Sequence, residues 1–564
     1  MTILGIDLGT TNSACGVWRD GAETLIPNSQ GNFLTPSVVG VDGKTNILVG
    51  KTAANRLVTN PENNVAVFKR LMGTDHRVGL GKEKFTATEL SSFVLRSLKN
   101  DAEAFLGEEI SEAVISVPAY FNDNQRHATK LAGELAGLKV QRLINEPTAA
   151  AMAYGLHEKG EGIFVVLDMG GGTFDVSVIE YFDGVMEVHA SAGDNFLGGE
   201  DFLEAMVVAF LDEHKIEREA LSKQDMQRLY EVLEQAKRAL SGPQPPCVEI
   251  ELAENNISYE VSAGWFSRIV TPLLLRVRNP IEQAIRDADI QVTKIEEVLL
   301  VGGATRMAMF RNTVGRLFSR IPSSTLDPDL VVAMGAAVQA GLKEKDQSLD
   351  DIVLTDVCPY SLGTDIADAE DPTKIGFFLP LIERNTTVPT SHVETLYTVQ
   401  DNQTAVQLGI YQGENRLVAK NVFLGAIDAK VPKNKAGRES VDVRFSYDMN
   451  GLLEVDVKVN SNGKTYKKVI EQSPGSLTGK ELEKSHKRLA ALKFHPREVE
   501  KNLELLSRGE RLYLLHLGGT RTVIGKQLAA FENVLDRQNQ REIDRAQQDF
   551  SMFLDQFDQE PLLP

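Results

Sequence analysis

Three glycine-containing turns are the parts of this sequence best suited to chemistry. Residues 7–11 read Asp-Leu-Gly-Thr-Thr, and residues 168–173 read Asp-Met-Gly-Gly-Gly-Thr. A third turn, at residues 299–306, reads Leu-Leu-Val-Gly-Gly-Ala-Thr-Arg and could pass flat against a base or ribose. Glycine lets backbone N–H groups approach and converge on a phosphate. One such turn more often serves only to connect two elements, but three of them together predict a nucleotide site.

Two acidic residues stand beside the first two turns. Asp7 and Asp168 each end an apolar run directly before the glycines. Mg²⁺ keeps several waters when bound, so carboxylates often hold it through its hydration shell. The alternative is that both are capping or turn aspartates. We favour the magnesium interpretation because a polyphosphate between the turns needs a compensating cation.

The elements around these turns predict an α/β fold. The apolar runs at residues 3–8 and 163–168 are typical of buried strands, and a helix is expected from near Thr88 to near Gly107. Strand–helix alternation of this kind continues to about Lys345 and favours a largely buried sheet. Because the first two turns resemble each other, the simplest explanation is a duplicated lobe in which each copy contributes one turn to a shared cleft.

The pattern changes after about residue 349. Apolar and polar residues alternate at residues 406–411, 441–447 and 453–459, with a turn at residues 448–451, which predicts an antiparallel β domain with one solvated face. After Ser476 the chain is rich in Leu, Glu, Lys and Arg and predicts helices. The predicted divisions are an α/β nucleotide-binding domain at 1–348, a linker at 349–357, a β domain at 358–475 and a helical segment at 476–564.

Composition restricts the classes of partner. The 564 residues carry a formal net charge of −19, which disfavours nucleic acid and anionic membrane as main partners. The three cysteines, Cys15, Cys247 and Cys358, stand far apart and are expected to be buried thiols in a reducing compartment. No apolar run reaches membrane-spanning length and the N-terminus lacks a leader pattern, so a cytoplasmic location is expected.

Several long motifs resemble one known family. Residues 5–13, 117–121, 145–151, 168–175 and 197–202 look like hallmark segments of the seventy-kilodalton heat-shock chaperones of the DnaK type. The resemblance runs in register from Thr2 to about Ile470 and weakens in the helical tail. Within the family the chain looks closest to the bacterial HscC class, notably at residues 188–196 and 358–363.

The resemblance implies an actin-like (duplicated ribonuclease H-like) ATPase domain, a β-sandwich peptide-binding domain and a short α-helical lid. It also implies ATP or ADP and Mg²⁺ as cofactors, with Asp7 and Asp168 at the metal. The residues implied in catalysis are Lys69, Glu146, Thr173 and Asp175. Those implied in nucleotide binding are Gly9, Thr10, Thr11, Gly170, Gly171, Gly172, Glu234, Lys237, Arg238, Ser241, Gly302, Gly303, Arg306 and Asp329. A lone lysine such as Lys69 would more often be a solvated charge, and only its motif overrides that interpretation. Ala304 stands where many relatives carry serine, so one adenosine contact is expected to be missing.

Further positions match the family's route between domains and its partner surface. The allosteric positions are Pro118, Arg126, Ile352, Val353, Leu354 and Asp356. Thr355 replaces an expected leucine in the linker, which predicts weaker coupling. Arg142, Asn145 and Asp356 match the surface presented to J-domain cochaperones. The insertion between Val248 and Val261 is short relative to DnaK, so the usual exchange-factor contact is left unassigned.

Four apolar residues match the lining of the family's peptide groove: Leu396, Val406, Leu408 and Leu452. The family binds extended peptides by backbone hydrogen bonds and one central apolar pocket. Each of the four could equally be sheet core. Thr364 replaces a branched apolar residue, and Ala367 with Val399 occupies the arch positions, so the peptide preference stays open. The helical tail is shorter than in DnaK, which predicts fast peptide exchange.

Three functional classes compete for this pattern. Sugar kinases and polymerising actin-like scaffolds share the fold and its phosphate turns, and fold alone does not decide function. Neither class needs a linker followed by an alternating β domain. We therefore expect an ATP-dependent chaperone, acting in stress response and protein folding, that binds and releases unfolded or extended peptides. Slow hydrolysis would be coupled to peptide affinity through the linker and accelerated by a J-domain cochaperone.

Overall fold

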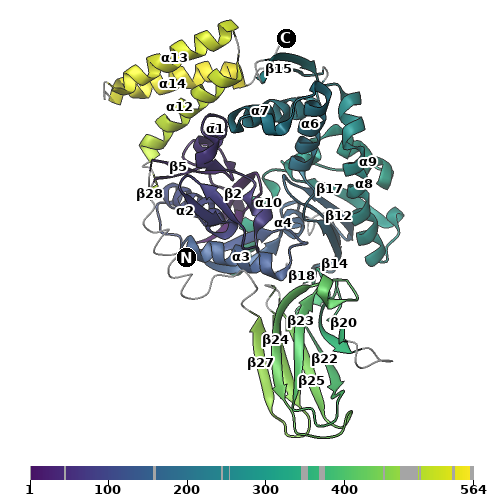
Figure 1. The fold of residues 1–564 in the computed structure, drawn as a ribbon. Helices are drawn as coiled ribbons and strands as arrows, with labels where there is room; N and C mark the ends of the chain where they lie inside the picture. The colour runs from purple at the N-terminus through teal and green to yellow at the C-terminus, as the bar shows by residue number, and fades with distance from the viewer. Residues whose placement is uncertain are drawn as a thin grey trace.

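The computed structural model shows an α/β body with a β domain at one end and a helical bundle at the other (Figure 1). It describes residues 2–43, 46–155, 160–242, 245–252, 255–344, 353–367, 375–448, 451, 453–470, 493–494, 497–516, 518–536 and 540–558. Ile352 and Leu452, two of the predicted site residues, lie outside the described residues. Among the helices that are described, none combines the length and the apolar character needed to cross a bilayer.

The first lobe is built on a mixed sheet. Its strands are β1 (Ile3–Asp7), β2 (Asn12–Arg19), β3 (Ala22–Leu25), β10 (Glu112–Val117) and β11 (Lys139–Asn145), in the order β11-β10-β1-β2-β3, with β4 (Thr35–Pro36) paired to β2. β1 runs parallel to β10 and antiparallel to β2, so Asp7 and the turn that follows it lie at the sheet's edge facing the second lobe. The apolar side chains of β1 are buried, as the sequence predicts.

The second lobe repeats this arrangement. Its strands are β12 (Gly162–Met169), β13 (Phe174–Phe182), β14 (Val185–Asp194), β17 (Ile295–Val301), β18 (Val353–Val357) and β21 (Thr387–Val388), in the order β17-β12-β13-β14-β18-β21. Here β12 is parallel to β17 and antiparallel to β13, matching the relation of β1 to β10 and β2. The two glycine turns therefore connect equivalent pairs of strands, which agrees with the predicted duplication.

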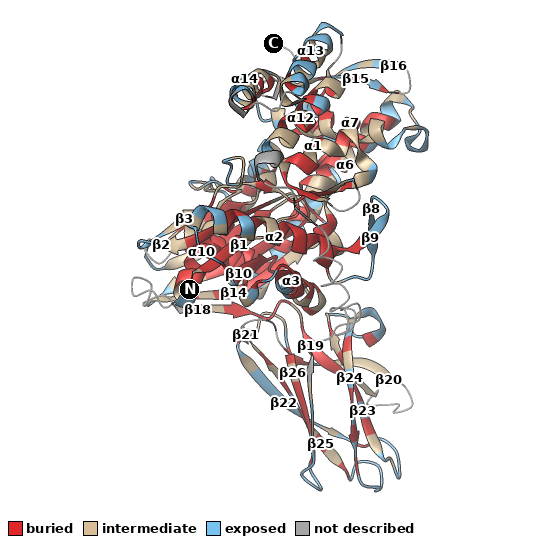
Figure 2. Cartoon of the chain, turned by 90° about the vertical axis from the view of Figure 1, so that its left-hand side faces the viewer, coloured by how far each residue is buried: buried red, intermediate tan, exposed pale blue. Residues whose placement is uncertain are grey.

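Helices cover the sheets and separate the two lobes. They are α1 (Lys51–Thr59), α2 (Ala87–Leu106), α3 (Asp123–Leu135), α4 (Glu146–Ala153), α6 (Gly199–His214), α7 (Lys223–Ala239), α8 (Ala263–Asp287), α9 (Ala308–Phe318) and α10 (Val331–Glu344). α10 packs against both α4 and β1. The predicted helix near Thr88 is α2, which begins with a capping box between Thr86 and Glu89 and ends at Gly107 in the left-handed conformation. Figure 2 shows the buried residues concentrated in the sheets and the helices against them.

Smaller strands complete the body. They are β5 (Val39–Asp42), β6 (Asn46–Val49), β7 (Asn64–Val65), β8 (Arg77–Leu80), β9 (Glu83–Thr86), β15 (Cys247–Leu252) and β16 (Asn255–Glu260). Cys15 and Cys358 are buried as expected. Cys247, on the β15–β16 hairpin, is only partly buried, which corrects the expectation of three buried thiols.

The β domain is a sandwich of two four-stranded sheets. One has the order β20-β19-β23-β24 and the other β22-β25-β26-β27. Their bounds are β19 (Leu362–Ala367), β20 (Ile375–Ile382), β22 (Thr390–Tyr397), β23 (Ala405–Gln412), β24 (Val422–Lys430), β25 (Ser440–Tyr447), β26 (Leu453–Val459) and β27 (Thr465–Ile470). The alternation at residues 441–447 and 453–459 corresponds to the antiparallel pair β25–β26, whose apolar side chains face the core between the sheets.

The C-terminal helices lie against the ATPase body. α12 (Arg497–Leu515), α13 (Gly518–Asp536) and α14 (Gln540–Asp558) form a bundle whose first helix packs along α1 (Figure 1). Arg511 anchors it by donating to Asn55 Oδ1 over 2.9 Å. The sequence predicted only helices here, but Lys493–Phe494 form a short strand, β28, parallel to β6. This strand adds to the edge of the sheet formed by β6, β5 and β7.

Candidate functional site

The two glycine turns meet at the bottom of a cleft between the lobes. Gly199 and Glu200, at the start of α6, donate their N–H groups to the carbonyls of Gly170 and Gly171, which fixes the second turn. A Cβ at Gly171 would lie only 2.5 Å from Thr11 Cγ2, so the absence of a side chain permits the contact between lobes. Both turns therefore present their backbone to the same space.

Most predicted nucleotide residues line this cleft, whose volume is about 520 Å³. Those on its wall are Asp7, Gly9, Thr10, Thr11, Lys69, Glu146, Asp168, Gly170, Gly171, Thr173, Glu234, Lys237, Arg238, Ser241, Gly302, Gly303, Arg306 and Asp329. Gly172 and Asp175 are not among the lining residues. The cleft also has lining residues that motif comparison did not single out, including Asn12, Leu34 and Pro328. The sequence does not mark their role, because loop residues come to line the cleft only when the chain folds.

A charged group at the cleft consists of four acids and one lysine: Asp7, Glu146, Asp168, Asp175 and Lys69. Lys69 Nζ lies 2.8 Å from Glu146 Oε1, with only 5% and 9% of the two side chains exposed. Ser116 donates to Asp7 Oδ1 over 2.7 Å. Burial, reinforced by Glu146, raises the pKa of Asp7 to about 7, and burial raises the pKa of Asp168 well above its ordinary range.

Asp175 completes this acidic group. Burial, with a further contribution from Glu146, raises its pKa to about 7. Tyr120 N–H donates to its Oδ1 over 2.9 Å, whereas its buried Oδ2 has no hydrogen-bond partner among the residues described here. One lysine does not neutralise four carboxyl groups, so the donor set fits a hydrated divalent cation. The described residues hold no cluster of three or more His, Cys, Asp or Glu side chains suited to direct metal binding. Any cation at Asp7 and Asp168 would then be held partly through water.

One end of the cleft is organised by α7. Glu234 forms an ion pair with Lys237 Nζ at 2.6 Å and accepts a hydrogen bond from Arg238 Nε at 2.8 Å, as their helical spacing allows. Lys237 also donates to the carbonyl of Gly199 over 2.8 Å. On the opposite side, Arg306 Nη2 lies 3.0 Å from Asp329. Two glycines precede that arginine, so the third turn presents bare backbone toward the space between these ion pairs.

A further ion pair joins the lobes near the phosphate turns. Arg70 Nη1 donates to Asp201 Oδ1 over 3.2 Å, and Arg70 Nη2 donates to the carbonyl of Gly171 over 3.3 Å. Arg70 follows Lys69 in the short 3-10 helix Phe68–Leu71, and Asp201 belongs to the motif at residues 197–202. The sequence showed both segments but gave no sign that they pair.

The linker is part of the second lobe's sheet. β18 pairs in parallel with β14, so Leu354 lies opposite Met186 and Thr355 opposite Glu187. Leu354 is buried in the cluster beneath that sheet. β18 also pairs with β21, which begins to connect the ATPase body to the β domain. For Val353, the structure describes the backbone pairing alone.

A buried chain of hydrogen bonds leads from the linker toward the cleft. Asn145 donates to Asp356 Oδ2 over 2.7 Å and accepts from Arg126 Nη2 at 2.6 Å. Arg126 in turn donates to the carbonyls of Ala119 and Phe121 over 3.1 and 3.2 Å. Pro118 begins this same short loop, since β10 ends one residue before it. The structure thus brings together Pro118, Arg126 and Asp356, three of the allosteric residues that the resemblance implied.

The same contacts involve the predicted partner surface. Asn145 and Asp356, which match positions presented to J-domain cochaperones, are both buried and hydrogen-bonded to each other. Burial also raises the pKa of Asp356 and lowers that of Arg142, which lies close enough to interact with Asp356 electrostatically. In this arrangement the linker itself covers the surface that the three residues would otherwise form.

The predicted groove residues lie at the sandwich interior. Val406 and Leu408, on β23, are buried in the core between the sheets, and Leu396 on β22 packs against that core while partly exposed. The structure therefore brings these three side chains to one core. It does not separate a groove lining from sheet packing at these positions.

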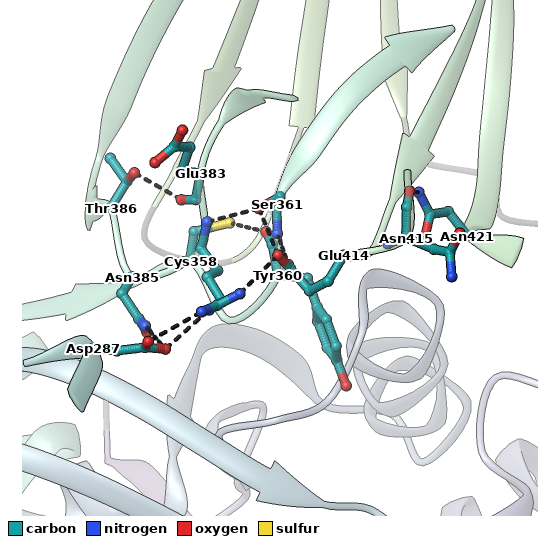
Figure 3. Close-up of polar contacts among 11 residues, drawn as sticks. Asp287, Cys358, Tyr360, Ser361, Glu383, Asn385, Thr386, Glu414, Asn415 and Asn421 are labelled. Carbon is teal, nitrogen blue, oxygen red and sulfur yellow. Dashed lines mark hydrogen bonds and ion pairs between the residues drawn. The ribbon is translucent and has the colours of Figure 1, made fainter. Parts of the chain in front are cut away.

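The β domain docks on the ATPase body through an ion pair at α8. Arg384 Nε and Nη2 donate to the two carboxylate oxygens of Asp287 over 2.9 and 3.0 Å. Asn385 donates to Asp287 Oδ2 over 3.0 Å (Figure 3). Asp123 at the start of α3 donates its N–H to Gln412 Oε1 over 3.0 Å.

A two-lobed nucleotide cleft, joined by a docked linker to a β sandwich, defines a nucleotide-dependent switch protein. Comparison with known proteins agrees: the model of the Hsp70 protein family matches residues 3–78 and 76–560. The chaperone protein DnaK of Thermotoga petrophila is 41% identical over 484 residues, covering 83% of this chain and 80% of that protein. The DnaK proteins of Thermotoga maritima and Thermotoga sp. strain RQ2 match to the same extent.

The chain therefore belongs to the Hsp70 family. Its members combine an actin-like ATPase domain with a β sandwich and a helical lid, and they use ATP or ADP with Mg²⁺. This protein is an ATPase and an ATP-dependent chaperone that binds unfolded peptides, and stimulation by J-domain cochaperones is a general property of its family. Sugar kinase and filament-forming scaffold are thereby excluded as its main class.

Proposed function

We propose that the inter-lobe cleft binds MgATP through the residues predicted from the motifs, each in a definite role. The two glycine turns with Thr10 and Thr11 hold the phosphates. The residues of α7 and the third turn hold the adenosine between them. Asp7 and Asp168 hold hydrated Mg²⁺, which neutralises phosphate charge. The observation that carries this proposal is the convergence of both turns and of Asp7, Glu146 and Asp168 on one cleft.

Hydrolysis then depends on positioning by buried groups. Lys69 is held in place by Glu146 and directs its ammonium into the cleft beside the phosphate turns. Thr173 lies on the wall with Lys69, and Asp175 is close enough to interact electrostatically with Glu146 and Lys69. We assign these four residues to orienting the attacking water and stabilising the charge that develops on the phosphate. No step requires a covalent intermediate on the protein.

We propose further that the linker couples the cleft to peptide affinity. The supporting observation is the buried hydrogen-bond chain from Asp356 through Asn145 and Arg126 to the loop at residues 118–121. Because β18 is a strand of the second lobe's sheet, a movement of that lobe also moves the linker. The domain divisions at 1–348, 349–357, 358–475 and 476–564 are part of the same proposal.

The finer assignments remain predictions. Membership of the HscC class rests on residues 188–196 and 358–363. A J-domain contact at Arg142, Asn145 and Asp356 would require the linker to leave the sheet, because two of the three are buried while it is docked. Leu396, Val406, Leu408 and Leu452 are proposed as groove lining on the resemblance alone. A cytoplasmic location and the need for an exchange factor likewise remain to be tested.

The first experiment measures release of a fluorescent extended peptide with and without ATP, beside a Lys69→Ala variant. The parent should release peptide faster with ATP, and the variant should still bind ATP while hydrolysing it about 10²-fold more slowly, as expected for loss of a preorganised charge. Lys82→Ala, at an exposed lysine, is the matched control and should behave like the parent. If Lys69→Ala hydrolyses ATP at the parent rate, the catalytic assignment is wrong. If no nucleotide state binds peptide, the coupling proposal is wrong.

A further inference from the structure

One residue of the β domain reaches the backbone beside the proposed catalytic residues. Tyr360 begins the β domain just after the linker strand, and Figure 3 shows its side chain pointing out of that domain toward the ATPase body. Its hydroxyl donates to the carbonyl oxygen of Tyr120 over 3.1 Å. The two tyrosine rings also pack together, with centroids 4.4 Å apart and planes inclined by 40°.

A second side chain reaches the same acceptor from the second lobe. Asn195, just past the end of β14, donates to the Tyr120 carbonyl over 2.9 Å and lies 3.5 Å from the Tyr360 hydroxyl. The Tyr120 carbonyl is thus held by one donor from the ATPase body and one from the β domain. Only the second donor depends on docking of the two domains.

Tyr120 is also bonded directly to Asp175. Its N–H donates to Asp175 Oδ1 over 2.9 Å, which leaves Oδ2 as the buried oxygen without a partner among the described residues. Gly193, opposite Asp175 in the β13–β14 pair, makes room for this contact. A Cβ there would lie 2.8 Å from Tyr120 Cβ and 2.9 Å from Asp175 Oδ1. The closeness of packing means that a shift of Tyr120 must move the carboxylate.

We propose that Tyr360 is a positioning residue for ATP hydrolysis, whose hydroxyl holds Tyr120 and, through it, the Asp175 carboxylate while the β domain is docked. This proposal rests on the role proposed above for Asp175. Tyr360 does not touch the cleft wall, so it acts on the rate rather than on ATP binding. Other docking contacts, such as the Arg384–Asp287 ion pair, hold the domains together without bonding to Tyr120. The Tyr360 hydroxyl therefore links docking of the β domain to the position of the Asp175 carboxylate.

The test uses the full chain and the Tyr360→Phe variant, which removes the hydroxyl and keeps the ring packing. Single-turnover hydrolysis should be about three- to ten-fold slower, the factor expected for one neutral hydrogen bond. ATP affinity should stay within about two-fold of the parent. Tyr397→Phe, at a tyrosine 61% exposed on β22, is the matched control and should leave both quantities unchanged.

A double-mutant cycle shows whether the effect passes through Asp175. Asp175→Asn should slow hydrolysis strongly, and adding Tyr360→Phe to it should cause little further loss, because residues that act as a unit are not additive. Protease protection of the linker should be the same in Tyr360→Phe as in the parent, with Arg384→Ala as the reference for weakened docking.

Three results would overturn the proposal. The first is a parent-like hydrolysis rate in Tyr360→Phe, and the second is a loss that persists in full in the Asp175→Asn background. The third is loss of linker protection in Tyr360→Phe, since the hydroxyl would then serve docking alone. If Asp175→Asn itself hydrolyses ATP normally, the role proposed for Asp175 fails as well, which separates that failure from failure of the tyrosine contact alone.

Discussion

Replacing Arg384 with alanine should weaken docking of the β domain and slow ATP-driven peptide release. Arg384 makes a bidentate ion pair with Asp287, at 2.9 and 3.0 Å, and a third contact with Glu414 at 3.1 Å. A third of the Arg384 side chain is exposed, against 14% of Asp287, so solvent screens the pair only in part. Exposed pairs contribute about 0–1 kcal/mol, and bidentate geometry raises that figure.

The loss should be near the lower end of what a bidentate pair provides. When Arg384 is removed, Asp287 keeps the hydrogen bond from Asn385, so its charge is not left without a donor. We therefore expect about 1 kcal/mol, equivalent to a roughly five-fold shift of the docking equilibrium toward the undocked form. Raising the ionic strength should reduce the difference between parent and variant, because the exposed side of the pair is screened by salt.

The assay combines linker protection against a protease, in ATP, with stopped-flow release of a fluorescent peptide. Asp287→Ala and the double variant complete a cycle whose coupling energy should also be about 1 kcal/mol. Arg438→Ala, at an exposed arginine of the same domain, is the control and should leave docking unchanged. If the two single effects simply add, with coupling below about 0.3 kcal/mol, the ion pair does not hold the domains together and the reasoning fails.

Three other predictions concern Asp123, Gly171 and Arg511. Burial raises the pKa of Asp123 to about 7 in the docked form, so docking takes up a proton. Protection of the linker against protease should therefore be strongest at low pH, fall as the pH rises to about 7 and level off above it. Asp123→Asn should flatten this pH dependence. Gly171→Ala should reduce ATP affinity at least ten-fold, measured by calorimetry, because the new Cβ would lie 2.5 Å from Thr11 Cγ2; unchanged affinity would show that the turns need not meet. Arg511→Ala should release the C-terminal bundle from α1, because it removes the hydrogen bond to Asn55. Faster hydrogen exchange confined to α12 would show this release. Unchanged exchange would mean that the Arg511 contact does not hold the helix.

Local patterns were enough to predict the elements and the turns of the cleft. The start and end of α2 follow from its capping box and Gly107, and the β25–β26 pair follows from two-residue alternation. Asp7 and Asp168 lie where an apolar strand must end, so their place at the cleft was also predictable. Each of these signals lies within a few residues of the feature that it specifies.

Contacts between distant segments were not predictable in this way. Arg511 lies 456 residues from its partner Asn55, and Tyr360 lies 240 residues from Tyr120. Arginine and tyrosine on an exposed surface look the same in sequence as arginine and tyrosine that dock a domain. The burial of Asp356 has the same origin, because it depends on the linker joining the second lobe's sheet.

When the linker and the β domain are docked, two separate contacts reach one short loop of the ATPase body, residues 118–121. The linker reaches residues 118–121 through Arg126, which binds the carbonyls of Ala119 and Phe121, and the β domain reaches the residue between them through Tyr360. On its other side this loop meets two of the proposed catalytic residues, since Tyr120 donates to Asp175 and the Phe121 ring lies 5.5 Å from the ammonium of Lys69. Because the two contacts bind different peptide groups of the loop, loss of either one leaves the other in place. Each should therefore make a partial contribution to the hydrolysis rate, and only undocking of the whole domain removes both together.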